Sequence, residues 1–403
     1  MKKILIVAPF LPAPPDNGGR IRLYNLLKNL SLKHDISLLS YIEPDQIGHL
    51  DEIKSWFKHI EVVQRKRLER GFLHLLKYTF TAYPITISIF NKEFKDKFIY
   101  LINTEKFDLI QFEFIVNAHL VKYIPDNIPT TIVIHAINFE SVIRGFKIMK
   151  FNIRKIYSLF EIIKIKFYED KILKKIGNII VTSDRDKEVL LKRVPISNIH
   201  VVPNGVDTVY FSPVPVTDEK NIIGFIGAFN TEISNIDAVI WFTKEVFPHI
   251  KNVVPDILFE IIGPGAPLEI KKLSSISENI VIRGYVDDVR VYLSNFKLLV
   301  LPLRGGSGTK VRVFTALSMG IPVVTTVYGA EGINDVDSEH GLFITKDTKE
   351  MVDIILKLIQ DKNYRDKVGN KGREIIVDKY DWKIAAKKMD FIWESIAENS
   401  SIN

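Results

Sequence analysis

Late in the chain a short apolar run leads directly into a glycine-rich loop. Leu298-Leu-Val-Leu-Pro302 is followed, after one residue, by Arg304-Gly-Gly-Ser-Gly-Thr-Lys310. The apolar run predicts a buried β-strand over 298–301. Four small residues, 305–308, let the backbone approach a ligand closely, because they add little or no side-chain bulk. This strand-to-loop junction indicates an α/β fold, in which ligands bind beyond the carboxyl ends of strands.

A helix is expected to follow this loop. Thr309 is the predicted N-cap, and Gly320 stands where a C′ glycine belongs, with Pro322 just beyond it. Free N–H groups at the start of this helix would point into the loop, where Lys310 and Arg312 add positive charge. A phosphate or diphosphate fits such a loop, although glycine runs also make plain tight turns. Neither a P-loop nor a dinucleotide-binding fingerprint occurs in the sequence.

Length and composition bound the class of protein. At 403 residues two domains are expected, and 46% apolar with 26% charged residues is ordinary globular composition. The sequence has no cysteine, which excludes disulfides and thiolate metal sites and favours a reducing compartment. No apolar run reaches the roughly 20 residues that span a bilayer. We therefore expect a cytoplasmic protein.

Positive charge is concentrated in the first half of the chain. Residues 1–200 carry 32 Lys and Arg against 21 Asp and Glu, whereas residues 201–403 carry 23 against 27. The excess gathers around 65–70 and in 141–176, where apolar and aromatic residues alternate with basic ones. Such a stretch is typical of a helix lying on an anionic membrane, here the inner face of the plasma membrane, but equally of a solvated helix packed on a core. Nucleic acid is not expected as a partner, since no recognition module is visible.

Short β-like runs alternate with helical patterns along the whole chain. The runs are 4–8, 36–40, 109–112, 130–135, 178–182 and 199–202, then 222–227, 257–262, 279–282, 298–301, 322–325 and 341–344. Apolar strands alternating with amphipathic helices predict parallel sheets covered on both faces. The two series predict an α/β protein of two doubly wound, Rossmann-like domains, 1–207 and 208–380, that face a central cleft.

A second glycine pair lies in the turn after the first predicted strand, Pro14-Pro-Asp-Asn-Gly-Gly-Arg20. Gly18 and Gly19 could present backbone amides to an anion, with Arg20 and Arg22 close by. Both this turn and the late glycine loop fall at carboxyl ends of predicted strands. They are therefore expected to line the cleft from its two sides.

Read in order, these pieces resemble the retaining glycosyltransferases of family 4, which have the GT-B fold. The motifs that carry the resemblance run through nearly the whole chain: Val201-Val-Pro-Asn-Gly-Val-Asp207, Phe225-Ile-Gly-Ala228, Ile261-Ile-Gly263-Pro264, Gly284-Tyr-Val-Asp-Asp288, Leu301-Pro-Leu-Arg-Gly-Gly-Ser-Gly-Thr309 and Ala316-Leu-Ser-Met-Gly-Ile-Pro-Val-Val324. The resemblance implies a nucleotide-sugar donor, linked to UDP or GDP, in the second domain. It implies a saccharide or lipid-linked acceptor on the first domain, no cofactor and no metal. It also places 381–403 in a helix that crosses back to the first domain.

The resemblance also assigns donor-binding residues. Gly18 and Gly19, with Arg20, would hold the diphosphate from the first domain. The late loop would hold it from the second domain through Arg304, Gly306, Ser307, Gly308, Thr309 and Lys310. Tyr285 and Val286 would form a wall of the base pocket, and Arg312 stands where the family usually has lysine.

Two departures from the family pattern concern the donor. Many relatives place two glutamates eight residues apart, and here those positions hold Ser307 and Thr315. Thr315 could still bond a ribose hydroxyl, but without the strength that a carboxylate gives, so lower donor affinity is expected. The basic pair usually found near 228–235 is also absent.

A histidine near the transferred sugar is a further family feature. In Ile132-Val-Ile-His-Ala-Ile-Asn-Phe-Glu-Ser141 the register is ambiguous, because the family motif aligned on Asn138 puts Ile137 at the histidine position. His135 and Glu140 are the catalytic candidates. His135 could bond a sugar hydroxyl or simply hold a strand end, and Glu140 could orient an acceptor or cap a helix. His119 and Glu113 are weaker candidates.

The sequence therefore favours a retaining hexosyltransferase that acts on a polysaccharide or glycolipid precursor. No protein nucleophile is evident. Two alternatives stay open: a GT-B nucleotide-sugar epimerase, and a catalytically weak binding or scaffold subunit of a polysaccharide assembly system.

Overall fold

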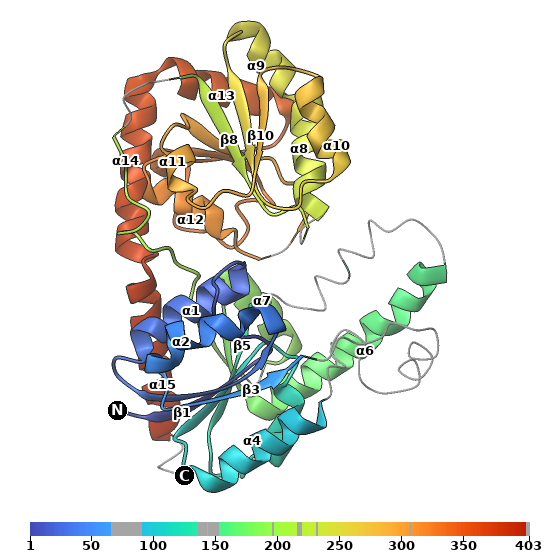
Figure 1. Cartoon of the computed structure of the whole chain (residues 1–403), viewed down its shortest axis with the longest axis vertical. Helices are drawn as coiled ribbons and strands as arrows, with labels where there is room; N and C mark the ends of the chain where they lie inside the picture. The colour runs from blue at the N-terminus through green and yellow to red at the C-terminus, as the bar shows by residue number, and fades with distance from the viewer. Residues whose placement is uncertain are drawn as a thin grey trace. The chain divides into compact units, whose positions relative to one another are not determined.

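The computed structural model describes residues 1–65, 91–135, 143, 153–195, 197–215, 220–230, 233–306 and 308–399. The chain divides into two compact units (Figure 1). Unit 1 comprises Met1–Pro203 and Trp382–Asn403, and unit 2 comprises Asn204–Asp381. The boundaries expected from the sequence were 207 and 380.

Unit 1 is built on a parallel sheet of seven strands in the order β3-β2-β1-β4-β5-β6-β7. Its strands are β1 (Lys3–Ala8), β2 (Asp35–Ile42), β3 (His59–Gln64), β4 (Leu109–Glu113), β5 (Thr130–Ile134), β6 (Asn178–Val181) and β7 (Asn198–Val201). Its helices are α1 (Gly18–Leu30), α2 (Leu50–Ile53), α4 (Lys92–Thr104), α6 (Ile153–Ile176), α7 (Asp184–Arg193) and α15 (Trp382–Asn399), with 3-10 turns η1 (Pro44–His49), η2 (Lys54–Trp56) and η4 (Ala118–Tyr123).

Helices cover both faces of this sheet, as the apolar runs of its inner strands require. Side chains alternate between the faces along β1: Ile4 and Ile6 pack with α1 and α15, whereas Leu5 and Val7 pack with α4, α6 and α7. The last helix of the chain therefore completes the core of the first unit (Figure 1).

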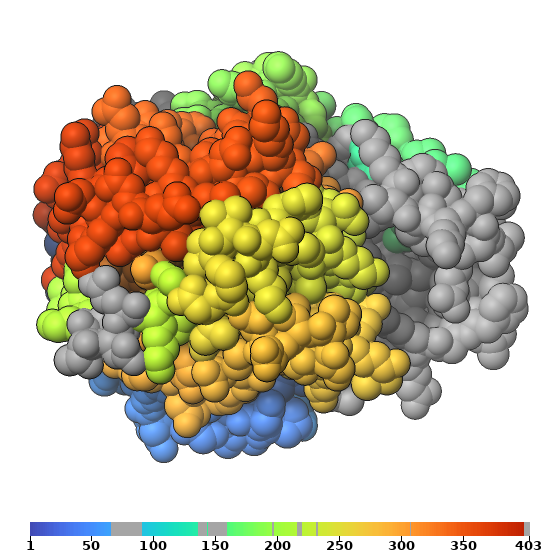
Figure 2. All heavy atoms as spheres, turned by 90° about the horizontal axis from the view of Figure 1, so that it is seen from above, coloured from blue at the N-terminus to red at the C-terminus, as the bar shows by residue number. Residues whose placement is uncertain are grey.

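Unit 2 is built on a parallel sheet of six strands in the order β10-β9-β8-β11-β12-β13. Its strands are β8 (Ile222–Ile226), β9 (Leu258–Ile262), β10 (Ile280–Gly284), β11 (Leu298–Leu301), β12 (Val323–Thr326) and β13 (Leu342–Thr345). Its helices are α8 (Ile233–Glu245), α9 (Phe247–Val253), α10 (Leu268–Lys271), α11 (Arg290–Leu293), α12 (Val311–Ser318), α13 (Thr348–Gln360) and α14 (Lys362–Lys379), with 3-10 turns η5 (Lys272–Ser275) and η6 (Ser338–His340). Figure 2 shows one face of this unit, on which the yellow α9 adjoins the orange-red α13.

The predicted doubly wound α/β class is confirmed for each unit, and all twelve predicted strands are present. One strand, β3, escaped prediction. It lies at the sheet edge and is mostly half-exposed, so its sequence, His59-Ile-Glu-Val-Val-Gln64, lacks the continuous apolar run of its neighbours.

Candidate functional site

The glycine loop of unit 2 connects β11 to α12. Gly306 (φ 108°) and Gly308 (φ 77°) both adopt backbone conformations that disfavour any side chain. The helix begins at Val311, and Lys310 occupies the N-cap position without a capping bond from its side chain. The prediction that Thr309 caps this helix is therefore wrong by one residue. The first amides of α12 are left without an intrahelical partner at the end of this loop.

Lys310 gives the loop its nearest positive charge. Its side chain is almost buried, and its Nζ lies 3.4 Å from the position that a Cβ on Gly306 would take. The Oγ of Ser234, in α8, lies 3.6 Å from the same position. A Cβ at Gly306 would only reach ordinary contact distance from these two groups, so the positive φ, and not a lack of space, is what favours glycine here.

The two arginines of the loop region differ in their surroundings. Arg304 is half exposed and forms an ion pair with Asp237 of α8 at 2.5 Å. Arg312 donates to the Ile226 carbonyl at 2.6 Å and to Asn235 Oδ1 at 2.8 Å. Arg312 thus joins α12 to the carboxyl end of β8, whereas the charge of Arg304 is balanced on the surface. The glycine at 227 belongs to this junction, because a Cβ there would lie 2.3 Å from Arg312.

Thr315 lies one turn into α12. Its hydroxyl donates to the Val311 carbonyl of its own helix at 3.2 Å. A ribose ligand would have to share or replace this bond. Its role as a ribose contact stays a prediction.

A pocket of about 450 Å³ lies at the carboxyl ends of β9 and β10. It is lined by Gly265, Ala266, Lys271, Ser274, Ile282, Arg283 and Gly284. Its size falls within the range of small-molecule sites. Tyr285 and Val286 follow directly in sequence; Tyr285 is 71% exposed, whereas Val286 packs on the core. The structure thus gives a hollow next to the predicted base wall, lined mainly by the preceding residues.

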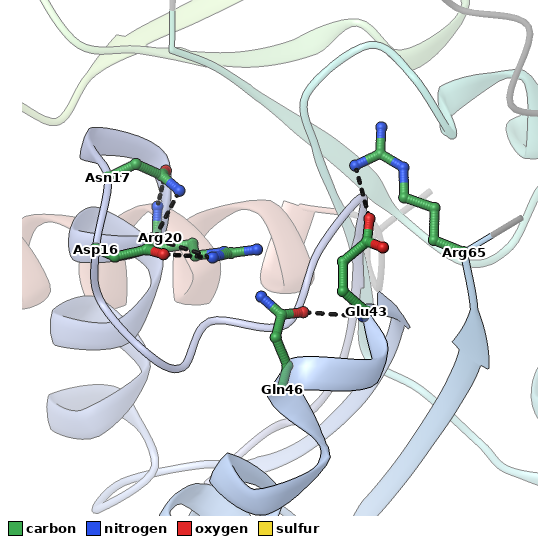
Figure 3. A network of polar contacts seen from close by, with 6 residues as sticks. All are labelled: Asp16, Asn17, Arg20, Glu43, Gln46 and Arg65. Carbon is green, nitrogen blue, oxygen red and sulfur yellow. Dashed lines mark hydrogen bonds and ion pairs between the residues drawn. The ribbon is translucent and has the colours of Figure 1, made fainter. Parts of the chain in front are cut away.

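In unit 1 the predicted glycine turn opens α1. Asn17 caps the helix by accepting from the Arg20 amide at 3.2 Å, and Arg20 pairs with Asp16 at 2.8 Å (Figure 3). Figure 3 also shows a neighbouring pair, Arg65 and Glu43, at 3.7 Å. Arg20 therefore has a carboxylate partner in its own turn, and its predicted contact with the donor stays a prediction.

The two glycines of this turn have different surroundings. A Cβ on Gly18 would meet nothing within 4 Å, whereas one on Gly19 would lie 3.0 Å from the rings of both Phe10 and Phe114. Gly19 therefore leaves room for an aromatic pair whose ring centroids are 5.4 Å apart. The predicted contact of both glycines with a diphosphate stays a prediction.

His135 lies at the carboxyl end of β5, beside Phe114 and Glu113 at the end of β4. Its Nε2 lies 2.8 Å from Glu113 Oε2, and its ring stacks on that of Phe114 with centroids 4.0 Å apart. Burial lowers the pKa of His135. The hydrogen bond to Glu113 opposes this shift, and the charge of Arg22 adds to it. The imidazole is therefore held in its neutral form and in a fixed orientation.

Arg22 supplies a buried positive charge near His135 and Glu113. It is fully buried in α1 and donates to the Pro203 carbonyl at 2.9 Å. Burial lowers its pKa to about 10, with the charge of Glu113 acting in the opposite direction, so it remains protonated at neutral pH. Arg22 and Glu113 therefore offset each other's charge next to His135.

Several candidates have other outcomes. His119 is buried, lies 3.3 Å from the Val116 carbonyl through Nδ1, and burial lowers its pKa to about 4, which is consistent with a structural role. Glu140 and Ser307 lie outside the described residues. Within the described ranges, no group of three or more His, Asp or Glu could hold a metal ion, and no helix is long and apolar enough to cross a membrane.

Two residues bonded in the row that ends at His135 were not predicted from the sequence. Gln111 of β4 and Trp393 of α15 lie 282 positions apart, yet Trp393 Nε1 donates to Gln111 Oε1 at 2.7 Å. The one feature of the sequence that pointed to Gln111 is the alternation of side chains along β4, which puts Gln111 and Glu113 on the same face of the sheet.

The units match two family models that together span most of the chain. Residues 16–210 match the model described as Glycosyltransferase Family 4, and residues 220–361 match that described as Glycosyl transferases group 1. Two parallel, doubly wound units of this kind define the GT-B class of fold. The chain belongs to the family 4, or group 1, glycosyltransferases.

Individual relatives are distant. The poly(ribitol-phosphate) alpha-N-acetylglucosaminyltransferase of Staphylococcus aureus (strain COL) is 26% identical over 51% of this chain and 41% of its own. The capsular polysaccharide biosynthesis glycosyltransferase CapM of Staphylococcus aureus is 25% identical over 30% of this chain and 32% of its own. The matches thus span less than half the length of these two relatives. The crystal structure of Anabaena HepE in complex with UDP covers 100% of both chains with a TM-score of 0.65 at 14% identity.

Proposed function

We propose that this chain is a retaining glycosyltransferase that transfers a hexosyl group from a UDP- or GDP-linked donor to a hydroxyl of a polysaccharide or glycolipid precursor. The observation that carries the proposal is the loop between β11 and α12. There two glycines with positive φ, the first amides of a helix and the buried Lys310 come together. Backbone amides at a helix start are the usual protein ligands of a phosphate or diphosphate.

The names of the relatives support the chemical class. One relative is named for N-acetylglucosamine transfer to poly(ribitol-phosphate), another for capsular polysaccharide biosynthesis, and the HepE structure contains UDP. The pocket beside Gly284 is large enough for a nucleobase. In this proposal unit 2 binds the nucleotide, and unit 1 presents His135 to the sugar or the acceptor.

The proposed reaction needs no protein nucleophile. The acceptor hydroxyl attacks the anomeric carbon on the face from which the nucleoside diphosphate leaves. The new glycosidic bond forms as the carbon–oxygen bond to the diphosphate breaks, and the hydroxyl proton passes to an oxygen of the leaving phosphate. The amides of the loop and Lys310 would stabilise the charge that develops on that diphosphate.

A panel of UDP- and GDP-sugars tests this function. Thermal-shift measurements should find one nucleotide that stabilises the chain, and NMR of the product should show the anomeric configuration of the donor. A product of opposite configuration would contradict retention. A donor that isomerises without acceptor would instead identify an epimerase.

A binding or scaffold role is the second candidate, because Thr315 stands where relatives have a carboxylate and its hydroxyl bonds to its own helix. Calorimetry with UDP and GDP separates this candidate from an enzyme. No detectable binding of either nucleotide at millimolar concentration would favour the scaffold.

We also propose that α6 lies on an anionic membrane surface, which would bring a lipid-linked acceptor to unit 1. Four apolar side chains of this helix are exposed, Leu159, Phe160, Ile163 and Phe167, and Phe167 is 69% exposed. Lys166 lies beside this row, with its Nζ 5.8 Å from the Phe167 ring centroid. An exposed aromatic row flanked by lysine is typical of a helix at a lipid interface.

Vesicle cosedimentation tests the membrane proposal. The chain should bind phosphatidylcholine vesicles that contain phosphatidylglycerol in a salt-sensitive way, and Phe160→Ser with Phe167→Ser should weaken that binding. Phe391→Ser is a matched control, because Phe391 of α15 is 73% exposed on a different helix. Equal binding to neutral and anionic vesicles would contradict the proposal.

A further inference from the structure

A continuous row of buried hydrogen bonds runs from the last helix of the chain to His135. Trp393 Nε1 donates to Gln111 Oε1 at 2.7 Å, and Gln111 Nε2 donates to Glu113 Oε1 at 2.7 Å. Glu113 Oε2 then lies 2.8 Å from His135 Nε2. Trp393, Gln111 and Glu113 are each at most 2% exposed. Polar groups so deeply buried need their partners, so the row is stable only with every bond made.

The row has one direction, because its first group can only donate. The Trp393 indole has an N–H and no acceptor, so it fixes the Gln111 side-chain oxygen toward itself. The Gln111 amide nitrogen must then face Glu113 and donate to Oε1. Oε2 of Glu113 then accepts a hydrogen bond from the Nε2–H of His135. The negative charge of the carboxylate is offset by the buried Arg22. His135 is thereby fixed with its proton on Nε2.

A second contact fixes the plane of the imidazole. The rings of His135 and Phe114 are nearly parallel, 5° apart. Phe114 adopts a left-handed backbone conformation, φ 63°, which is rare for a bulky residue. Strained conformations of this kind cluster at functional sites, because the surrounding structure must hold them in place. The hydrogen bond thus sets the ring's rotation in its plane, and the stack sets the plane itself.

We propose that Glu113 is a positioning residue which, with Gln111 and Trp393 behind it, holds His135 as the Nε2–H tautomer and leaves Nδ1 as the acceptor for a hydroxyl of the sugar or acceptor substrate. The proposal rests on the proposed transferase function for its substrate. The structural assignment itself, a tautomer selected by a donor-only indole on the C-terminal helix, does not depend on catalysis. Among the described residues Nδ1 makes no hydrogen bond, so its acceptor lone pair is not used by them.

Proton-detected ¹⁵N NMR of histidine-labelled protein tests the assignment directly. The chain has nine histidines, and the signal that disappears in His135→Gln belongs to His135. The wild-type signal should be that of a neutral ring protonated at Nε2. A ring protonated at Nδ1, or at both nitrogens, at neutral pH would overturn the proposal.

Glu113→Gln should reverse the tautomer. The oxygen of the new amide must accept from Gln111, so its nitrogen faces His135 and donates to Nε2, which pushes the proton to Nδ1. The transfer kcat should fall about 10- to 100-fold, by analogy with the loss of a partner that orients a metal-ligating histidine, with little change in donor KM. Glu188→Gln, an exposed substitution in α7 of the same unit, should change neither the NMR signal nor the rate.

Trp393→Phe is the second variant, because it removes the indole N–H and keeps a smaller aromatic ring in the core. In this variant a fraction of the molecules should have His135 protonated at Nδ1, and kcat should fall by a smaller factor than in Glu113→Gln. Reversal of the tautomer with no change in transfer would overturn the positioning role. The expected tautomer in a chain that transfers no sugar from any donor would instead contradict the proposed function and leave the tautomer assignment intact.

Discussion

At the strand ends of unit 1, side chains from β4, the end of β5 and α15 bond to one another, and the charge of Arg22 in α1 offsets that of Glu113. At the strand ends of unit 2, the candidate ligands are the backbone of a glycine loop and the first amides of α12, with Lys310 and Arg312 beside them. Under the proposed function, the difference corresponds to two ways of recognising a substrate. Unit 1 fixes side-chain orientation before a ligand arrives, whereas unit 2 offers main-chain donors whose positions depend on the absence of side chains.

The strongest test of this contrast is Gly308→Trp. At φ 77° any side chain is strained, and an indole would occupy the loop, so donor nucleotide binding should weaken at least about 100-fold while the fold persists. Calorimetry with UDP and GDP measures the loss, and circular dichroism checks the fold. Gly305→Ala is the matched control, since a Cβ there meets nothing within 4 Å and should be tolerated. Nucleotide affinity unchanged in Gly308→Trp would place the site elsewhere.

Acid should destabilise unit 1 before unit 2. Burial lowers the pKa of three described histidines of unit 1, His119, His135 and His200. The unfolded chain binds protons more readily than such a folded histidine, so the stabilisation is complete above the ordinary pKa and is lost as pH falls through the folded pKa. For His119 that window runs from about 6.5 down to about 4 and is worth at most about 3 kcal/mol.

Urea unfolding at pH 7 and pH 5 measures this effect. With Trp241→Phe, the remaining tryptophans, Trp56, Trp382 and Trp393, all report on unit 1. His119→Gln in that background should reduce the loss of unfolding free energy between the two pH values. An identical loss with and without His119 would show that other groups dominate.

The two arginines beside the glycine loop, Arg304 and Arg312, sharpen the comparison within unit 2. Arg312→Met leaves the Ile226 carbonyl and Asn235 without their donor, so the free energy of unfolding should fall by about 1–3 kcal/mol. Arg304→Gln breaks an exposed ion pair with Asp237 and an exposed contact with the Trp241 ring, and should cost about 1 kcal/mol or less. Denaturant titration of both variants checks the order. Equal costs would show that Arg312 does not join α12 to β8.

The smallest expected effect concerns Thr315. Thr315→Glu restores the carboxylate of the family pattern and should tighten donor nucleotide binding about 3- to 10-fold, because a charge-assisted bond to ribose is stronger than that of a hydroxyl. Thr315→Gln has nearly the same size without the charge and serves as control. Tightening by both variants to the same degree would mean that charge at this position is irrelevant to the donor.

The sequence allowed prediction of features that depend on local pattern. Buried parallel strands are continuous apolar runs, so the strand of 298–301 and its glycine loop could be located before the structure was known. The helix start was placed one residue early because threonine is a preferred N-cap residue, whereas the helix begins after Lys310, which has no side-chain cap. The edge strand β3 escaped prediction because its half-exposed residues lack an apolar run.

Features that depend on tertiary contact could not be predicted. No spacing in the sequence relates Trp393 to Gln111, because the two meet only after α15 packs on the sheet of unit 1. The pairing of Arg20 with Asp16, which balances a charge expected to serve an anion, likewise depends on how the turn before α1 folds. Glu113 was only a weaker candidate, since a glutamate in a buried strand has no functional meaning until its neighbours are known.

Hydrogen–deuterium exchange with and without UDP or GDP tests the central claim most directly. If main-chain amides of the glycine loop hold the diphosphate, the binding nucleotide should slow exchange in the peptide spanning residues 305–313 more than in any other part of unit 2. Slowed exchange confined to other segments, with 305–313 unchanged at saturating nucleotide, would contradict the account.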